Sequence, residues 1–415
     1  MYNLFPVLSQ LSTYRLTYLT NDITAAIIVT LLLLPQSMAY ALVAGVPISM
    51  GLIAATIPLV IYAIFGGSRY LTVGPVSVVS LLSLTGLSTL AQPSSSEYLM
   101  LIIVLAFLVG VIQLVMGIGR VGTILKYISS SVTYGFTSAL AIIIMLNQIP
   151  SILGVKLPKY QGFFRYVEEV VTHLSMTNMV TFAIGIGSIF ILFLFQKKMD
   201  VKIGPLFVII LSVLIVDNFD LEKRGTEIVG FIPRDIFGTT FQFPTLDIVW
   251  SLLPIAITIS FISFFESYSV AKTLADKERE SINPNQELVG IGFANIASSF
   301  VGSIPVGGAV SRAAVSYESG AKSNLSIIIT ALFMLLAILY VTPMLYFLPK
   351  ATLGAIIIIA VKNLINFHPL RMKHGISEAI LYVVTFATTL LVDVFLGIIV
   401  GVFISLGLNV LSRLK

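Results

Sequence analysis

The sequence has 415 residues, of which 57% are apolar and 10% are Asp, Glu, Lys or Arg, whereas a soluble protein carries about 25% charged residues. The mean hydropathy of +1.02 therefore excludes a protein that exposes most of its surface to water. The net charge of +5 comes without a basic run, so nucleic acid is not expected as a partner. The absence of Cys excludes a disulfide framework, a thiolate metal site and a Cys nucleophile. Three His are too few for an imidazole metal cluster.

Long apolar blocks without charge, such as residues 23–67 and 101–119, predict an all-α membrane protein, because about 20 helical residues cross the hydrocarbon layer. We predict about fourteen membrane segments. The first seven lie near residues 23–44, 50–66, 75–90, 98–118, 131–148, 177–196 and 203–217. The second seven lie near residues 248–272, 287–302, 309–318, 325–347, 351–365, 377–392 and 394–412. The polar stretch 217–248 separates the two sets, so we expect a first repeat over residues 1–230 and a second over residues 231–415.

The Lys and Arg residues are unevenly divided between the two sides of the predicted membrane protein. With the N-terminus inside and fourteen crossings, the inner side holds 16 of them and the outer side 7, with Arg312 left in the membrane. This excess predicts that both termini are cytoplasmic. Seven segments per half also mean that the two halves insert with opposite orientation. Inverted halves that each contain one short, interrupted segment are typical of secondary transporters.

The third and the tenth segments are the short ones, and they open in the same way. Each begins with Gly, a small residue, Val and Ser: Gly74 to Ser77 in the third, Gly308 to Ser311 in the tenth. Two ordinary helix starts would also use Pro and Ser, but the matching places in both halves favour a functional pair. A half-helix that begins inside the membrane exposes unpaired N–H groups with a partial positive charge. Two such termini facing each other would bind an anion without a metal.

Arg312 and Glu266 are ionisable residues that we expect deep inside the membrane. A buried Arg costs at least about 2.5–3.5 kcal/mol at a helix centre, so we expect a bound anion or a carboxylate to offset that cost. Carboxylates inside the membrane commonly serve as proton or cation sites, which makes Glu266 the candidate for coupling the anion to H⁺ or Na⁺. A structural salt bridge between the two residues is the alternative.

The first segment carries two polar residues at mid-depth, Gln36 and Tyr40, directly after Pro35 and one turn later. Pro35 kinks a helix and frees a backbone carbonyl, and either polar side chain could bind an anion or a neighbouring helix. We expect the turn at residues 66–69 to determine the fold rather than to bind a ligand. No Gly-x-Ser-x-Gly motif with His and Asp partners occurs, so no enzymatic activity is expected.

Several ordered motifs surround these residues. The first half holds Pro35-Gln-Ser-Met-Ala-Tyr40-Ala-Leu-Val-Ala-Gly45-Val-Pro47, Gly67-Ser-Arg69 and Gly74-Pro75. The second half holds Glu266-Ser-Tyr-Ser-Val-Ala-Lys272, Asn283-Pro-Asn-Gln-Glu287-Leu and Gly308-Ala-Val-Ser-Arg312. Together they resemble the signatures of the sulfate permease (SulP) family of anion transporters, and the similarity covers nearly the whole chain.

This resemblance implies a fourteen-segment fold of two inverted seven-helix repeats, sorted into a core domain and a gate domain. It also implies a substrate site between half-helices three and ten. The positions that match the family's site are Gln36, Tyr40, Ser77, Ser311 and Arg312. Family members usually continue into a cytoplasmic STAS domain, which we do not expect within the sequence up to Lys415.

Family members with a carboxylate at the position of Glu266 are typically cation-coupled symporters. The resemblance therefore implies a secondary active transporter, with sulfate:H⁺ symport as the first choice and Na⁺-coupled bicarbonate or H⁺-coupled dicarboxylate symport next. An anion exchanger, a channel or voltage-driven motor, and a nucleobase permease of the same fold are further alternatives, although Arg312 favours an anion. We expect a homodimer spanning the inner or plasma membrane, with no cofactor or metal besides the coupling ion.

Overall fold

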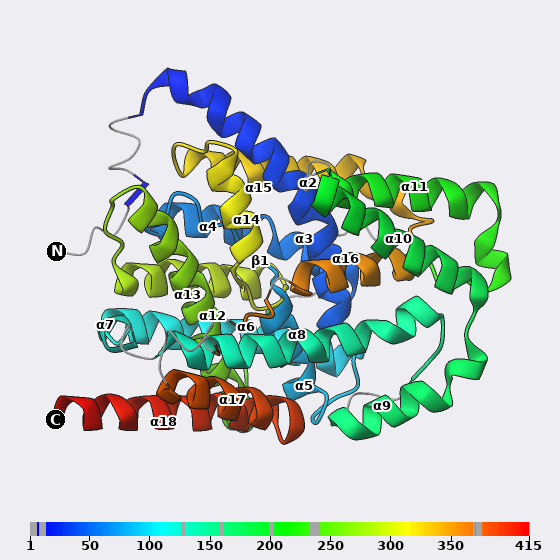
Figure 1. Cartoon of the computed structure of the whole chain (residues 1–415). Coiled ribbons are helices and arrows are strands. Elements are labelled where there is room, and N and C mark those ends of the chain that lie inside the picture. Colours follow the sequence, from blue (N-terminus) through cyan, green and yellow to red (C-terminus); the bar gives the residue numbers. More distant parts are fainter. Residues whose placement is uncertain are drawn as a thin grey trace. The chain divides into compact units, whose positions relative to one another are not determined.

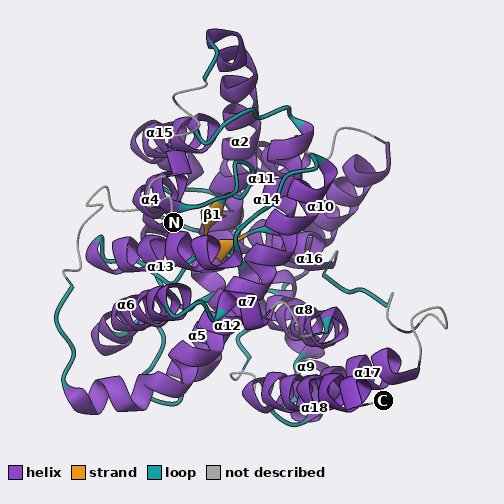
Figure 2. Ribbon diagram, turned by 90° about the vertical axis from the view of Figure 1, so that its left-hand side faces the viewer, coloured by secondary structure: helices purple, strands orange, loops and turns teal. Residues whose placement is uncertain are grey.

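The computed structural model describes residues 6–7, 14–125, 129–157, 162–198, 203–231, 241–362, 364–367, 370 and 376–414. Helices make up nearly all of its regular structure (Figure 1), which confirms the predicted all-α class. The described residues also contain a two-stranded antiparallel sheet, drawn in orange in Figure 2.

The chain forms two compact units. Unit 1 consists of Met1–Ile124 and Phe231–Met344, and unit 2 consists of Leu125–Gly230 and Leu345–Lys415. The helices of predicted segments 1–4 and 8–11 lie in unit 1, and those of segments 5–7 and 12–14 lie in unit 2. Each unit therefore takes helices from both halves of the chain. The division into two inverted repeats, over residues 1–230 and 231–415, stays a prediction.

Unit 1 is built around long helices that pack on one another. Helix α13 packs on α6 and α4, α2 packs on α15 and α3, and α12 packs on α6 and β2. The elements of unit 1, with α7 and η4 at its sequence boundaries, are η1 (Leu16–Tyr18), α2 (Leu19–Val43), α3 (Ile48–Ala54), α4 (Ile57–Phe65), β1 (Val73–Gly74), α5 (Ser77–Leu87), α6 (Ser96–Ile118), α7 (Gly122–Leu125), α12 (Leu246–Lys277), α13 (Pro284–Phe300), β2 (Gly307–Gly308), α14 (Val310–Glu318), α15 (Leu325–Tyr340) and η4 (Thr342–Leu345).

Unit 2 is an assembly of helices in which α8 packs on α16 and α17, α17 packs on α18, and α10 packs on α16 and α11. Its elements are α8 (Ser130–Leu153), α9 (Phe163–Thr172), η2 (Leu174–Met176), α10 (Met179–Lys198), α11 (Gly204–Asn218), η3 (Leu221–Arg224), α16 (Lys350–Lys362), α17 (Ile376–Leu391) and α18 (Val394–Leu414).

Helix length separates membrane-spanning segments from shorter ones. Among the described residues, six stretches are long and apolar enough to cross a membrane, namely residues 16–43, 48–65, 96–118, 130–153, 179–197 and 246–277. Helix α5 has 11 residues and α14 has 9, which at 1.5 Å per residue is roughly half the thickness of the hydrocarbon layer. Short helices thus occupy the predicted third and tenth segments.

The first two predicted segments each contain a Pro residue in a different helical position: Pro35 lies inside a helix, and Pro58 lies at the start of one. Pro35 lies inside α2, which continues past it to Val43, so this Pro does not divide the first segment. The predicted second segment, near residues 50–66, consists of two helices, because α3 ends at Ala54 and α4 begins at Ile57 with Pro58 in its first turn. A Pro is favoured in the first turn of a helix, where its missing N–H has no partner to lose.

The sheet joins the two segments that precede the short helices. Val73 pairs with Gly308 and Gly74 pairs with Gly307 in an antiparallel arrangement. A Cβ atom on Gly308 would lie 2.6 Å from Leu71 Cδ1, and one on Gly307 would lie 2.8 Å from Ser263 Oγ. A side chain at either position would therefore force these neighbours or the strand to shift, whereas glycine fits without a shift.

Candidate functional site

All six residues predicted for the site lie in unit 1, and Arg312 is at the centre of their arrangement. Its side chain is fully buried, with 0% of its surface exposed. Nη1 donates hydrogen bonds to Gln36 Oε1 at 3.1 Å and to the Pro75 carbonyl oxygen at 3.0 Å. Nη2 donates to the Thr72 carbonyl oxygen at 3.4 Å. These three acceptors are neutral, so they orient the guanidinium without cancelling its charge.

The two short helices begin beside each other within unit 1. Helix α5 starts three residues after β1, and α14 starts two residues after β2, so the pairing of the strands fixes the two N-termini close together. Figure 1 shows α14, in yellow, running down toward β1. The N-cap residues, Val76 and Ala309, have side chains that accept no hydrogen bond from the N–H groups of the first turn. Both first turns therefore keep N–H groups with a partial positive charge, which suit an anion.

Tyr40 and Ser77 complete the polar lining. Both side chains are buried, each 5% exposed. The side chain of Tyr40 interacts with that of Ser77 and is within electrostatic range of Arg312 and Glu266. Ser311 differs, because it is exposed at the first turn of α14. The structure thus brings Gln36, Tyr40, Ser77 and Arg312 together, with Ser311 next to them in the chain and accessible to a solute.

Glu266 lies in the middle of α12 and is buried, with 8% of its surface exposed. In the part of the chain that the structure describes, its Oε2 atom has no hydrogen-bond partner. No described ion pair within 4.0 Å includes Glu266 or Arg312, although each lies within electrostatic range of the other. The direct salt bridge considered as an alternative is therefore not formed in this structure, and the carboxyl group has an oxygen free to hold a proton or a cation.

The residue after Glu266 connects α12 to the sheet. Ser267 Oγ accepts a hydrogen bond from the Gly308 N–H at 2.8 Å and donates to the Ser263 carbonyl oxygen at 2.6 Å. Ser263 Oγ donates in turn to the Val306 carbonyl oxygen at 3.3 Å. These hydrogen bonds connect the helix that carries Glu266 to β2, which ends two residues before α14 begins.

Sequence reasoning missed the backbone contribution to this site. The carbonyl oxygens of Thr72 and Pro75 hold Arg312, and side-chain patterns do not reveal which way a carbonyl points. The Gly and Pro residues around 74–75 signal irregular backbone, which was the available clue. The buried side chains of Glu287 and Asn295 also contact the segments that lead to the short helices.

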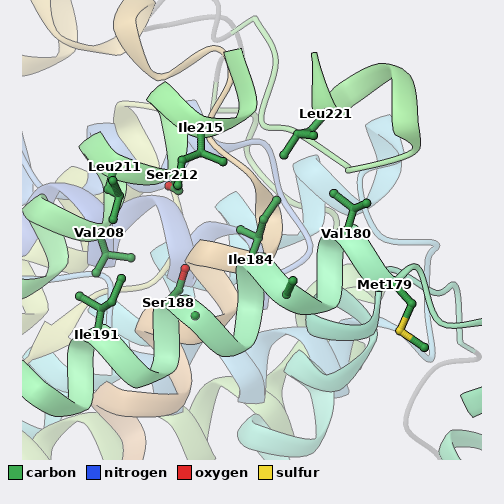
Figure 3. Close-up of a pocket in the computed structure, with 12 residues that line it drawn as sticks. Met179, Val180, Ile184, Ser188, Ile191, Val208, Leu211, Ser212, Ile215 and Leu221 are labelled. Carbon is green, nitrogen blue, oxygen red and sulfur yellow. The ribbon is translucent and has the colours of Figure 1, made fainter. Parts of the chain in front are cut away.

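A separate cavity of about 490 Å³ lies between α10 and α11 in unit 2 (Figure 3). Its lining is almost entirely aliphatic, including Ile184 and Val208. The two lining hydroxyls shown in Figure 3 have partners: Ser188 Oγ lies 3.1 Å from Thr352 Oγ1, and Ser212 Oγ donates to the Ile209 carbonyl oxygen at 3.0 Å. The cavity contains none of the predicted site residues and offers no charge to an anion, so we do not assign the site to it.

Comparison with known proteins gives consistent results over almost the whole chain. A family model described as the sulfate permease family matches residues 19–409. The chain is 35% identical to sulfate transporter 4.1, chloroplastic, of Arabidopsis thaliana, in an alignment that covers 97% of this chain and 60% of that protein. The chain therefore spans about 60% of the length of this curated relative.

Two solved structures share the fold. The structure of SLC26A9 matches with a TM-score of 0.91 and 25% identity, covering 99% of this chain and 68% of that chain. The transmembrane domain of BicA, a cyanobacterium bicarbonate transporter, matches with a TM-score of 0.78 and 21% identity, covering 94% of this chain and 98% of that chain.

Proposed function

The chain belongs to the sulfate permease family, and on this premise we propose that it is a secondary active transporter that moves sulfate together with H⁺. The observation that carries the proposal is the buried guanidinium of Arg312, held by three neutral oxygens where the N-termini of α5 and α14 meet. This junction has an excess of positive charge, which favours an anion. Sulfate is the first choice because the similar plant protein is named a sulfate transporter.

The donors around Arg312 suit an oxyanion. Gln36 uses its Oε1 atom toward Arg312, so its amide N–H groups remain as donors. The hydroxyls of Tyr40, Ser77 and Ser311 are further donors, and the first-turn N–H groups of α5 and α14 supply partial positive charge. The guanidinium gives a charge-assisted hydrogen bond, which is stronger than a neutral one. A bound anion would offset the cost of burying Arg312.

Glu266 is the proposed coupling site. A proton on its carboxyl group removes a negative charge from the neighbourhood of the incoming anion. Protonation should therefore strengthen anion binding, and by linkage the bound anion should strengthen proton binding to the same degree. The link through Ser267 to Gly308 gives this effect a structural route to the start of α14. We propose alternating access as the transport mode, with unit 1 carrying the whole site as one body.

A single panel of transport assays tests the proposal. The purified protein is reconstituted into liposomes, and uptake of labelled sulfate is measured with an imposed pH gradient, a Na⁺ gradient or neither, with bicarbonate and succinate as competitors. We expect sulfate to accumulate above equilibrium only with an inward H⁺ gradient. Accumulation driven by the Na⁺ gradient would show that Na⁺ and not H⁺ is the coupling ion. If bicarbonate or succinate competes more strongly than unlabelled sulfate, that anion is the better candidate for the substrate. Flux that is independent of both gradients would indicate an exchanger or a channel.

A further inference from the structure

Glu287 is a completely buried carboxyl group that the proposed transport cycle does not use. It lies in the first turn of α13 with 0% of its surface exposed. Its Oε2 accepts a hydrogen bond from the Tyr62 hydroxyl at 2.7 Å, and its Oε1 accepts from the N–H groups of Gly67 at 2.7 Å and Ser68 at 3.0 Å. Three donors on one carboxyl group form a strong, directional anchor.

This anchor holds the segment that leads to α5. Ser68, whose N–H is held by Glu287, accepts hydrogen bonds with its Oγ from the N–H groups of Tyr70 and Leu71 at 3.4 and 3.3 Å. The next residue, Thr72, provides a carbonyl oxygen that binds Arg312. A Cβ atom on Gly67 would lie 2.8 Å from Glu287 Oε1, so the close approach requires glycine there. Three residues thus separate the last anchored residue, Ser68, from Thr72, whose carbonyl oxygen accepts from the guanidinium.

The same helix holds the segment that leads to α14. Asn295, also 0% exposed, accepts a hydrogen bond with its Oδ1 from the Val306 N–H at 2.8 Å and donates with its Nδ2 to the Val306 carbonyl oxygen at 3.0 Å. Val306 directly precedes β2. Asn295 also donates to Gln113 Oε1 at 3.0 Å, which fixes its orientation. Figure 2 shows α13 reaching the orange strands.

We propose that α13 sets the relative position of the two short-helix N-termini, with Glu287 and Asn295 as positioning residues for the anion site. Each one fixes the approach segment of one terminus, and among the described residues neither forms a hydrogen bond with Arg312. Binding sites need their groups held within about 0.5 Å of the productive geometry. A single helix that holds both approach segments meets this need, because both N-termini are then fixed relative to the same helix and so relative to each other. The proposal rests on the proposed function for its binding readout.

The test uses Glu287→Ala with Asp22→Ala as the matched control. Asp22 is also a carboxyl group in unit 1 with 0% exposure. It likewise accepts from two backbone N–H groups, those of Lys322 and Ser323, and from two hydroxyls, those of Ser323 and Tyr14. None of these partners lies in the segments that lead to α5 or α14. Asp22→Ala loses at least as many hydrogen bonds as Glu287→Ala, so both variants should have a lower melting temperature.

Two readouts separate positioning from simple stabilisation. Titration of sulfate into detergent-solubilised protein should show an affinity that is about tenfold weaker or more in Glu287→Ala and close to wild type in Asp22→Ala. Hydrogen exchange followed by mass spectrometry should show faster exchange over residues 66–76 in Glu287→Ala alone. This second readout needs no ligand. If wild type does not bind sulfate, the proposed function fails while the exchange data still decide the positioning role.

Unchanged sulfate affinity in Glu287→Ala, or an equal loss in Asp22→Ala, would overturn the proposal, and so would unchanged exchange over residues 66–76. If Glu287→Ala does not fold, Ser68→Ala tests the same approach segment, since it removes the hydroxyl that accepts from Tyr70 and Leu71. We expect weaker sulfate binding in a folded Ser68→Ala protein, and wild-type affinity there would contradict the proposal. For the other segment, Asn295→Ala should speed exchange over residues 303–309.

Discussion

The hydrogen bonds of Arg312 are made to oxygens, yet its charge is not paired. Both Nη atoms donate to neutral oxygens, and the described ion pairs within 4.0 Å do not include this residue. A guanidinium keeps its proton in proteins, so the cost of its burial must be offset by nearby negative charge. Glu266 lies within electrostatic range but not in contact. An anion at the junction of α5 and α14 would supply the missing charge.

Replacement of Glu266 by Gln should uncouple transport from its gradient. The Glu266→Gln side chain imitates the protonated carboxyl group, so the protein should still bind sulfate and exchange it across the membrane. It should no longer accumulate sulfate when an inward H⁺ gradient is imposed, because no group is left to carry the proton. Counterflow exchange and gradient-driven uptake, measured in the same liposome preparation, check this expectation.

The outcomes of the Glu266→Gln assay point to different roles. Loss of both activities would indicate that the carboxyl group is needed for the arrangement of the site rather than for coupling. Accumulation that still follows the pH gradient would place the coupling site elsewhere. A change of Glu280 to Gln serves as the control, because this exposed carboxylate pairs with Arg69 outside the site and should leave both activities unchanged.

At the scale of the elements, the pattern of apolar residues predicted most of the helices and the two short segments, because these depend on local sequence, but it missed α9 and the break between α3 and α4. It did not predict β1 and β2, since two-residue strands are too short to show an alternating pattern. Their pairing joins residues 235 positions apart, as Val73 and Gly308 do, and depends on packing that a single sequence does not display. The carbonyl oxygens of Thr72 and Pro75 that accept from Arg312 were not predictable for the same reason, whereas Arg312 itself could be singled out as an ionisable residue in an apolar part of the sequence.

The sheet should tolerate no side chain at Gly308. In Gly308→Ala the new methyl group would meet Leu71, whose side chain is completely buried, so Leu71 or the strand would have to shift. Overpacking of this kind costs about 1–3 kcal/mol. We expect a lower melting temperature and weaker sulfate binding, because the strand pair positions both short helices.

Gly187→Ala is the matched control for that change. Gly187 lies inside α10, and no atom lies within 4 Å of the place that its Cβ would take. Ala there should leave stability unchanged or raise it by about 0.5–1 kcal/mol, since Gly is unfavourable within a helix. Equal melting temperatures for the two variants would show that the strand pair is not closely packed.

At the scale of the whole molecule, each unit is assembled from both halves of the chain. A division by sequence position, at residue 230, and a division by packing therefore give different domains. The sequence pattern predicts two halves, but it could not show which helices pack together, because that depends on contacts between distant segments. The resemblance to a known family supplied the sorting into core and gate domains.

The absence of Cys makes the predicted membrane orientation directly measurable. A single Cys introduced at Lys223, in η3, is predicted to lie outside, and one at Lys272, near the end of α12, is predicted to lie inside; both positions are exposed. In intact cells a membrane-impermeant maleimide should label Lys223→Cys and should label Lys272→Cys only after permeabilisation. The reverse pattern would invert the orientation, and labelling of both positions in intact cells would refute the predicted number of crossings between them.

The central claim is that Arg312 forms a binding site for a small anion, and calorimetric titration of sulfate into the wild-type protein and into Arg312→Ala tests it most directly. A hydrogen-bonded charged group contributes about 1.5–3 kcal/mol, so we predict that Arg312→Ala weakens sulfate binding by roughly 10- to 100-fold. Arg312→Lys should restore only part of the affinity, because a point charge does not reproduce the planar guanidinium. Arg165→Ala, which removes an exposed Arg in α9 of unit 2, should bind as wild type does. Sulfate affinity that is the same in a folded Arg312→Ala protein as in wild type would contradict the account.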